Sequence, residues 1–221
     1  MKGTIDSMTK AQTATKAPAT RVRPGRNEEG RLEILTAATT AFMQLGYARA
    51  SIDEIADQLG ATKGRVYHYY RSKADILMDI HRHVLDLMYG ELQPLAQAAS
   101  ATEALRDMAF RHAMIVMENL AFTRVALLST TDLFVNEKQQ SFISEISEVR
   151  GAYEAMFVDV LERGMASGEF RQANAKLLAK PLLGSLNWTT MWYVDREGST
   201  QETRERIAGI VTDYVMGGVR K

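Results

Sequence analysis

Apolar residues recur along this chain every three or four positions, and no stretch shows the strict alternation of a half-buried strand. The first spacing is that of amphipathic helices. The pattern therefore predicts an all-α protein. The segments expected to be helical are residues 28–45, 52–59, 63–70, 73–89, 102–119, 122–134, 137–166, 174–194 and 200–216.

The segment from Ser51 to Lys73 predicts two short helices joined by a tight turn. Ser51 and Glu54 have the spacing of a capping box, in which each side chain satisfies a backbone N–H of the other residue. Gly60 tolerates the positive φ at which a helix can stop and turn. Thr62 is placed to cap the second helix. Two short helices so arranged form the framework of a helix-turn-helix.

The second of these helices has little to bury, because only Val66 and Tyr70 are spaced to face inward. Its other positions offer cations, hydrogen-bond donors and aromatic rings, from Lys63, Gly64, Arg65, Tyr67, His68 and Tyr69. A short helix of this chemistry, preceded by a supporting helix, is typical of proteins that read the major groove of DNA.

The segment resembles the DNA-binding domain of the TetR family of bacterial transcriptional regulators, over residues 27–80. The resemblance rests on Leu45-Gly46-Tyr47, on Ser51, Ile52, Ile55 and Ala56, and on Gly60, Thr62, Lys63, Gly64, Val66, Tyr67, Tyr69, Tyr70, Ser72 and Lys73. It implies an N-terminal three-helix helix-turn-helix DNA-binding domain and a C-terminal helical ligand-binding and dimerisation domain. The implied function is that of a ligand-responsive repressor that binds a palindromic operator as a homodimer.

Positions of this segment are expected to contact DNA in different ways. The resemblance implies that Tyr67 and Lys73 grip phosphate, and Ser51 is a further candidate because a helix N-terminus favours an anion. Arg65 is expected to read guanine, since a guanidinium matches its O6 and N7 bidentately; a phosphate contact is the alternative. Thr62 belongs to the same DNA-facing set. The positions that the family places at base edges are Lys63, Gly64, Arg65, His68 and Tyr69.

Basic and acidic residues balance over the whole chain, with 27 of each. The basic residues are in excess over residues 1–75, as expected for a DNA-facing module attached to a more acidic regulatory body. We expect a disordered basic arm at 1–26, the DNA-binding domain at 27–75 and the effector-binding and dimerisation domain at 76–221. The arm either contacts DNA phosphates or serves as a solubilising tail.

The body of the chain is interpreted through the family resemblance. It implies that the helix at 73–89 transmits the allosteric signal and that the last two helices form the dimer. Gly184 and Ser185 would allow helices to approach closely, and the apolar stripe at 207–215 offers a seam. Packing of these helices inside one subunit only is the alternative.

The expected effector pocket lies in the body, where most of the methionines are found. Methionine side chains adapt to irregular apolar cavities, although they also fill ordinary cores. His112 and Asn119 fall on an apolar helix face, so we expect either ligand contacts or hydrogen bonds within the core. The pocket candidates are Met108, His112, Ile115, Asn119, Phe142, Ile146, Tyr153, Trp188 and Trp192.

Residues 140–218 resemble a TetR subgroup that regulates the breakdown of fatty acids, phenylacetate and steroids and responds to acyl-CoA thioesters. In that resemblance Trp188 and Trp192, which share a helix face, would line an acyl or pantetheine channel, whereas large core anchors are the alternative. The effector is therefore expected to be a small hydrophobic molecule, and an acyl-CoA thioester in particular. Two other functions stay open: a repressor of an efflux system that senses hydrophobic drugs, and a helical enzyme or binding protein.

Several classes of site are excluded or not expected. The absence of cysteine excludes disulfides, thiolate zinc sites and cysteine nucleophiles. The four histidines form no metal-binding pattern, and no nucleophile–base motif or phosphate loop is present, so we expect no catalytic residue, metal or cofactor. No apolar run approaches the roughly 18–20 residues of a membrane span, and residues 1–26 lack the apolar region of a signal peptide. We expect a cytoplasmic protein with no membrane partner.

Overall fold

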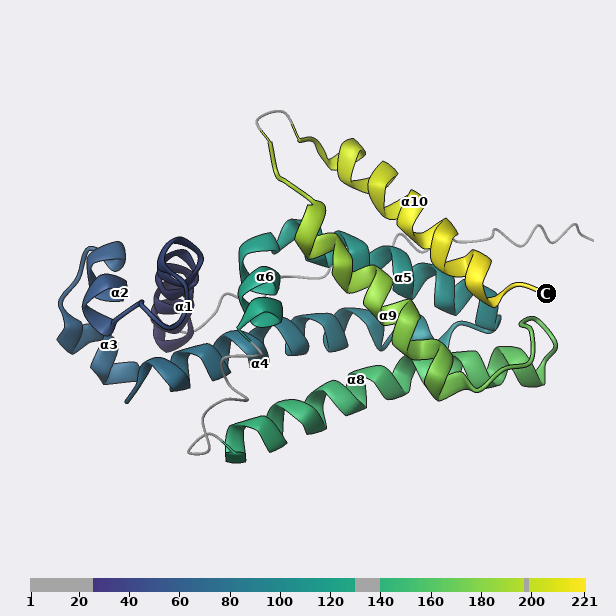
Figure 1. Ribbon diagram of the computed structural model, residues 1–221, viewed down its shortest axis with the longest axis horizontal. Coiled ribbons are helices and arrows are strands. Elements are labelled where there is room, and N and C mark those ends of the chain that lie inside the picture. The colour runs from purple at the N-terminus through teal and green to yellow at the C-terminus, as the bar shows by residue number, and fades with distance from the viewer. Residues whose placement is uncertain (1–25, 130–139, 197–198) are drawn as a thin grey trace, which may run out of the picture.

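The computed structural model describes residues 26–129, 140–196 and 199–221, which are helical or connect helices and include no strand (Figure 1). The all-α prediction is confirmed. The N-terminal helices are α1 (Arg26–Leu45), α2 (Ile52–Leu59) and α3 (Lys63–Tyr69). They are followed by α4 (Lys73–Leu92), the 3₁₀ turn η1 (Leu95–Gln97), α5 (Ala101–Glu118) and α6 (Leu120–Leu128). The last helices are α8 (Gln140–Ala166), α9 (Ala175–Trp192) and α10 (Gln201–Val219).

The N-terminal helices enclose a hydrophobic cluster of their own at one end of the elongated molecule (Figure 1). Ile34 of α1, Ile55 of α2 and Val66 of α3 are fully buried in it. The cluster also takes in Val125 of α6 and Ile146 of α8. The body is therefore packed directly against the DNA-binding domain, and the boundary expected after residue 75 runs through a continuous apolar contact.

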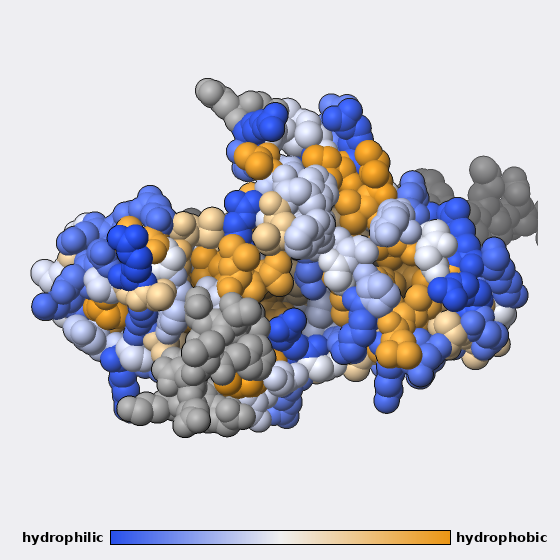
Figure 2. Space-filling view, viewed as in Figure 1, coloured by the Kyte–Doolittle hydropathy of each residue, from blue (hydrophilic) through white to orange (hydrophobic). Residues whose placement is uncertain are grey.

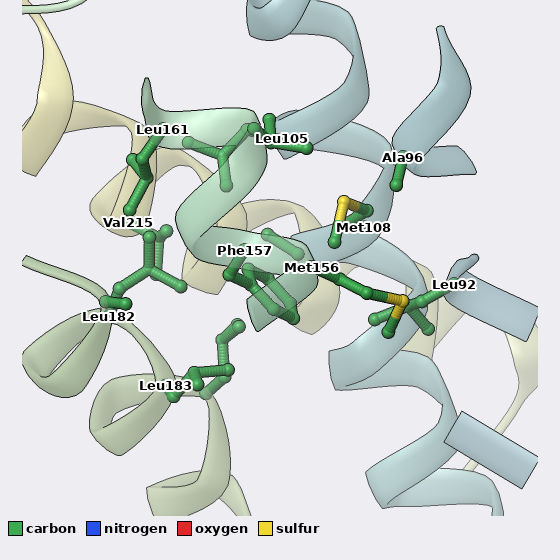
Figure 3. Close-up of a cluster of buried hydrophobic side chains, with 14 of the residues drawn as sticks. Leu92, Ala96, Leu105, Met108, Met156, Phe157, Leu161, Leu182, Leu183 and Val215 are labelled. Atoms are coloured by element: carbon green, nitrogen blue, oxygen red, sulfur yellow. The ribbon is translucent and has the colours of Figure 1, made fainter. Parts of the chain in front are cut away.

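The core of the body lies where α5 packs against α8, α9 and α10. Phe157 of α8 is fully buried at its centre, surrounded by leucine, valine and methionine side chains from these helices and α4 (Figure 3). Met108 and Ile115 of α5 are also fully buried in this cluster. At roughly 1.5–3 kcal/mol for each such side chain, this burial fixes the body as one packed unit.

Two of the differences from the predicted helix boundaries have a clear local cause. Helix α4 continues past Gly90 to Leu92, because Met88 and Leu92 are both buried in the core of the body and packing outweighs the low helix propensity of glycine. Ser100, and not Thr102, caps α5, and its hydroxyl accepts a hydrogen bond from the Glu103 N–H.

The end of α8 is tied to the start of α5. Phe170 folds back onto α8 so closely that a Cβ at Gly164 would lie 2.2 Å from its ring. Glu169 then accepts hydrogen bonds from the Thr102 N–H at 2.8 Å and from the Ser100 hydroxyl at 2.7 Å. These bonds and the dipole of α5 lower the pKa of Glu169 to about 2.

Some predictions fall outside the described residues: the arm at 1–25, residues 130–139 of the two predicted helices around that position, and the side chain of Phe142. Within the ranges that the structure describes, none of the helices combines the length and apolar character needed to cross a bilayer.

Candidate DNA interface and effector cavity

Three features were predicted for the turn between α2 and α3: a capping box, a left-handed glycine and a cap by Thr62. The first two are present. The capping box is present: the Ser51 hydroxyl accepts from the Glu54 N–H, and the Glu54 carboxylate accepts from the Ser51 N–H. Gly60 ends α2 with φ of 63°, in the left-handed region that glycine tolerates. Thr62 is the residue before α3, but its side chain makes no capping hydrogen bond, so the predicted cap is wrong.

Most of the α3 positions expected to meet DNA are exposed to solvent. Val66 and Tyr70 are buried, as predicted. The exposed residues are Thr62, Lys63, Gly64, Arg65, Tyr67 and His68. At Gly64 the nearest atom to an added Cβ would be 3.6 Å away, so the free protein has room for a side chain there and any need for glycine must come from a partner.

The two cations at the start of α3 are each paired with an exposed carboxylate. Arg65 bonds to Glu33 of α1, and Lys63 lies 3.3 Å from Asp53 of α2. Exposed pairs of this kind are worth only about 0–1 kcal/mol. A DNA phosphate or base edge can therefore take these cations from the protein carboxylates at little cost.

Tyr69 and Lys73 have structural contacts that differ from the DNA contacts expected of them. The Tyr69 hydroxyl lies against α1, where a Cβ at Gly30 would be only 2.3 Å from it. The Lys73 ammonium donates to the carbonyls of Tyr47, Ala48 and Ala50 at 2.6, 3.2 and 2.8 Å, so it anchors the α1–α2 connection. An ammonium has three donors, and all three are used here.

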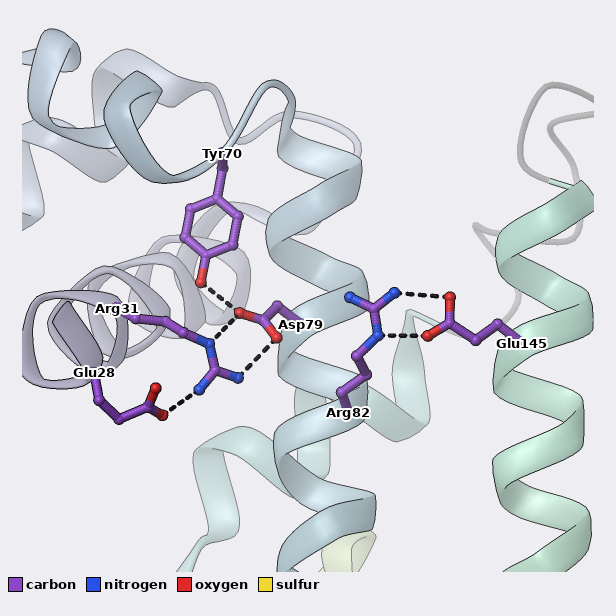
Figure 4. Close-up of polar contacts among 6 residues, drawn as sticks. All are labelled: Glu28, Arg31, Tyr70, Asp79, Arg82 and Glu145. Atoms are coloured by element: carbon purple, nitrogen blue, oxygen red, sulfur yellow. Dashed lines mark hydrogen bonds and ion pairs between the residues drawn. The ribbon is translucent and has the colours of Figure 1, made fainter. Parts of the chain in front are cut away.

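A polar network joins the DNA-binding domain to α4. Asp79 accepts two hydrogen bonds from Arg31 of α1, at 2.6 and 2.8 Å, and a third from the Tyr70 hydroxyl at 2.6 Å (Figure 4). Burial would raise the pKa of Asp79, but the bonds from Arg31 and Tyr70 outweigh it and the pKa is lowered. On the other side of α4, Arg82 forms a bidentate pair with Glu145 of α8, at 2.5 and 2.7 Å.

A cavity of about 320 Å³ lies in the body beside α4. Helix α4 lines it with His81, Val84, Leu85 and Met88, and α5 and α6 with Val116, Thr123, Ala126 and Leu127. The α8 and α9 walls consist of Arg150, Tyr153, Glu154, Lys180, Leu183, Gly184, Asn187 and Thr190.

Of the predicted pocket residues whose side chains the structure describes, only Tyr153 lines this cavity. His112 lies behind it, with its Nδ1 2.6 Å from the Tyr153 hydroxyl, so it is a buried supporting residue. Burial lowers the pKa of His112 to about 4 despite the opposing effect of Asn187. Asn119 is a helix-end residue whose amide donates to the Ile115 carbonyl.

The other candidates whose side chains are described do not line this cavity, for a common reason: their helix faces point elsewhere. Met108 and Ile115 face the solid core, and Ile146 faces the DNA-binding domain. Trp188 and Trp192 of α9 point to solvent, with 61% and 47% of their surfaces exposed.

The outer faces of α9 and α10 are unusually apolar for a surface. Figure 2 shows apolar side chains gathered along α9 and in the angle between α9 and α10. The large exposed apolar side chains here are Leu177, Trp188, Met191, Trp192, Ile210 and Tyr214. A contiguous patch of this kind marks an interaction site.

The pocket candidates named from the sequence did not include His81 and Arg150. His81 occupies the apolar stripe of α4 with Leu77, Val84 and Met88, which is the same signal that drew attention to His112. Arg150 carries no local signal, because only the packing of α8 beside α4 brings it to the cavity.

Comparison with known proteins agrees with this geometry. Residues 34–80 match the model for bacterial regulatory proteins of the tetR family, and residues 98–219 match a tetracyclin repressor-like C-terminal domain. The chain is similar to the transcriptional repressor KstR2 of Mycolicibacterium smegmatis, at 24% identity over 80% of this chain and 84% of KstR2. It is also similar to the fatty acid metabolism regulator protein of Bacillus subtilis, at 24% identity over 74% and 84% of the two chains.

Solved structures show the same fold. The TetR-family regulator PfmR of Thermus thermophilus superposes with a TM-score of 0.74 at 26% identity, over 85% of this chain and 99% of PfmR. AibR, solved with isovaleryl coenzyme A and operator DNA, superposes with a TM-score of 0.67 at 19% identity, over 82% and 97% of the two chains. Because the C-terminal match alone spans more than half of the 221 residues and the N-terminal match covers the helix-turn-helix, this chain belongs to the TetR family of bacterial transcriptional regulators.

Proposed function

We infer that this regulator is a homodimeric repressor that holds a palindromic operator and releases it when a small hydrophobic effector, an acyl-CoA thioester, enters the body. The observation that carries this proposal is the position of the cavity. Four of its lining residues belong to α4, the helix whose other side chains hold the DNA-binding domain.

The recognition surface of each subunit is the outer face of α3. Arg65 is proposed to reach a base edge and Lys63 and Tyr67 to reach the backbone, since all three are exposed on one short helix. Ser51 and the N-terminus of α2 add a phosphate contact. Lys73 supports this surface through the α1–α2 connection and is not proposed to touch DNA.

Two copies of this surface require a dimer. The apolar outer faces of α9 and α10 are proposed as the interface, because water-exposed Trp188, Ile210 and Tyr214 would be buried there against a second copy. The two α3 helices would then meet half-sites about 34–36 Å apart, one turn of DNA.

Effector binding is proposed to act through α4. A ligand in the cavity touches His81 and Val84, while Asp79 and Arg82, on the same helical turns, hold α1 and α8. A shift or rotation of α4 would change the spacing of the two recognition helices. The effector drives release only to the extent that it binds the shifted state more tightly.

The size and lining of the cavity favour an acyl group. Its 320 Å³ lies at the lower end of the roughly 300–1,000 Å³ of ligand pockets, so it holds an acyl chain while the rest of a CoA thioester extends outside. Two cationic side chains, Arg150 and Lys180, line the cavity against the single carboxylate of Glu154, so the charge of the lining favours an anionic ligand over a cationic drug. The names of the Bacillus subtilis relative and of the AibR complex point to the same ligand class.

Fluorescence anisotropy with the purified protein and DNA from upstream of its own gene tests this proposal. We expect tight, salt-dependent binding that a medium- or long-chain acyl-CoA reverses and that cationic dyes do not. Binding that dyes reverse and thioesters do not would overturn the effector class in favour of drug sensing. Turnover of any tested ligand would overturn the assignment as a simple repressor.

A further inference from the structure

His81 is a buried polar group that the fold leaves unpaired. Its side chain lines the cavity, only 4% of its surface is exposed, and its Nε2 has no hydrogen-bond partner among the residues that the structure describes. Buried side-chain polar atoms are almost always hydrogen-bonded, so an exception at a cavity wall points to a partner that enters from outside.

The protonation state of His81 limits what that partner can be. Burial, reinforced by the charge of Arg150, lowers the pKa of His81 to about 4. The imidazole is therefore neutral at pH 7 and offers one N–H donor and one nitrogen acceptor. A neutral group with one donor suits a neutral acceptor such as a carbonyl oxygen.

Arg150 places a charge beside His81. It lines the cavity from α8, is exposed, and has no carboxylate partner within the described ranges of the chain. The other cation of the lining, Lys180, is already paired with Glu154. Arg150 is thus the cation of the cavity wall that remains available for an anionic ligand group.

Apolar residues of α4, α5 and α9 make up much of the remaining lining, alongside polar ones such as Asn187 and Thr190. Val84, Met88, Val116 and Leu183 line this part of the cavity. An aliphatic chain can be buried against them, while its polar head stays near His81 and Arg150.

We propose that His81 and Arg150 recognise the effector: the imidazole N–H donates to the acyl carbonyl oxygen, and the exposed guanidinium pairs with an anionic group of the ligand, which is the carboxylate itself in a fatty acid or a phosphate in a CoA thioester. This rests on the proposed role of the cavity as the effector site. Two sources present this chemistry, a free fatty carboxylate and a CoA thioester whose phosphates lie outside the cavity.

The position of His81 gives this contact a regulatory consequence. It lies on α4 two residues after Asp79 and one before Arg82, whose ion pairs are drawn in Figure 4. The hydrogen bond that His81 donates to the ligand therefore acts on the helix that positions both α1 and α8. A ligand that lacks the carbonyl would fill the cavity without forming this hydrogen bond.

The test is a thermodynamic cycle measured by isothermal titration calorimetry on the full-length protein. The probes are decanoyl-CoA and its thioether analogue S-decyl-CoA, which differ only in the carbonyl oxygen. We expect the wild type to prefer decanoyl-CoA by about tenfold, the effect of one buried hydrogen bond. His81→Phe should abolish this preference, whereas His81→Gln, which keeps a donor, should retain part of it. Equal preference in wild type and His81→Phe would overturn the role of His81.

Arg150 is tested with decanoate, decanoyl-CoA and CoA alone. Arg150→Gln should weaken binding of the anionic ligands by about tenfold and reduce its dependence on salt. Arg106→Gln, which removes a cation that is paired with Asp213 and does not line the cavity, is the matched control and should change neither the affinity nor its dependence on salt. Unchanged ligand affinity in Arg150→Gln would overturn its role. Preference for decanoate or for the thioester identifies the source of the acyl head.

Operator binding separates this inference from the proposed function. All variants should bind operator DNA as the wild type does in the absence of ligand. If decanoyl-CoA binds to the wild type and to the variants with equal affinity and releases operator DNA from all of them, the roles of His81 and Arg150 are wrong and the proposed function stands. If the wild type binds operator yet none of these probes, the acyl effector is wrong and this inference fails with it.

Discussion

Replacing Asp79 by asparagine should destabilise the protein by about 2–3 kcal/mol. Asn keeps the size of the side chain but removes the charge that holds Arg31 and accepts from Tyr70. Removing one partner of a buried ion pair costs roughly 3–5 kcal/mol, and we expect somewhat less here because the Arg31 side chain is 26% exposed and can be partly rehydrated. An Asn amide would also place one N–H₂ group near the guanidinium.

Urea denaturation followed by circular dichroism, at one fixed protein concentration and pH 7, measures this loss. The control is Asp213→Asn, which removes the exposed partner of Arg106 and should cost less than about 1 kcal/mol. The double variant with Arg31→Gln should recover part of the loss, because the guanidinium is then no longer left without its partner. An Asp79→Asn loss no larger than that of Asp213→Asn would refute the reasoning that this network holds α1 and α3 to α4.

Three further predictions follow from the remaining sites. Arg65→Ala should relax base preference at one operator position in a binding-site selection, and weakening that is uniform over all sequences would instead indicate a phosphate contact. Trp188→Glu should weaken dimerisation by more than about tenfold in analytical ultracentrifugation, since it charges the centre of the proposed interface, and an unchanged dimer would exclude α9 from that interface. Glu169→Gln should lower the melting temperature at pH 7. Because the pKa of Glu169 is lowered in the folded protein, the ionised carboxylate contributes its full stabilisation above about pH 4.5 and loses it as the pH falls towards 2. The difference in melting temperature between wild type and Glu169→Gln should therefore vanish near pH 2.

The sequence by itself determined the features that depend on residues three or four positions apart. The capping box of Ser51 and Glu54 and the left-handed turn at Gly60 are local, and both are present as expected. The buried positions of α3 were predicted for the same reason, since Val66 and Tyr70 lie on one face of a single short helix. Helix caps and stripes need no knowledge of the rest of the chain.

Only the tertiary structure decided which face of each body helix is buried. Helix α9 has apolar residues on several sides, and packing turned Leu183 and Leu186 inward and left Trp188 and Trp192 in solvent. A helical stripe gives the direction of a side chain relative to its own helix and not relative to its neighbours. For this reason the sequence could suggest that the two tryptophans line a channel, although in the folded protein they face solvent.

The cavity depends even more strongly on the fold. It brings His81 of α4 next to Arg150 of α8, two residues on helices that are far apart in sequence. The same long-range packing gives Arg65 and Lys73 their protein partners, Glu33 and the α1–α2 connection. Contacts between distant segments form only when the helices pack together to bury their apolar faces, so the local pattern that specifies each helix leaves its neighbours undetermined.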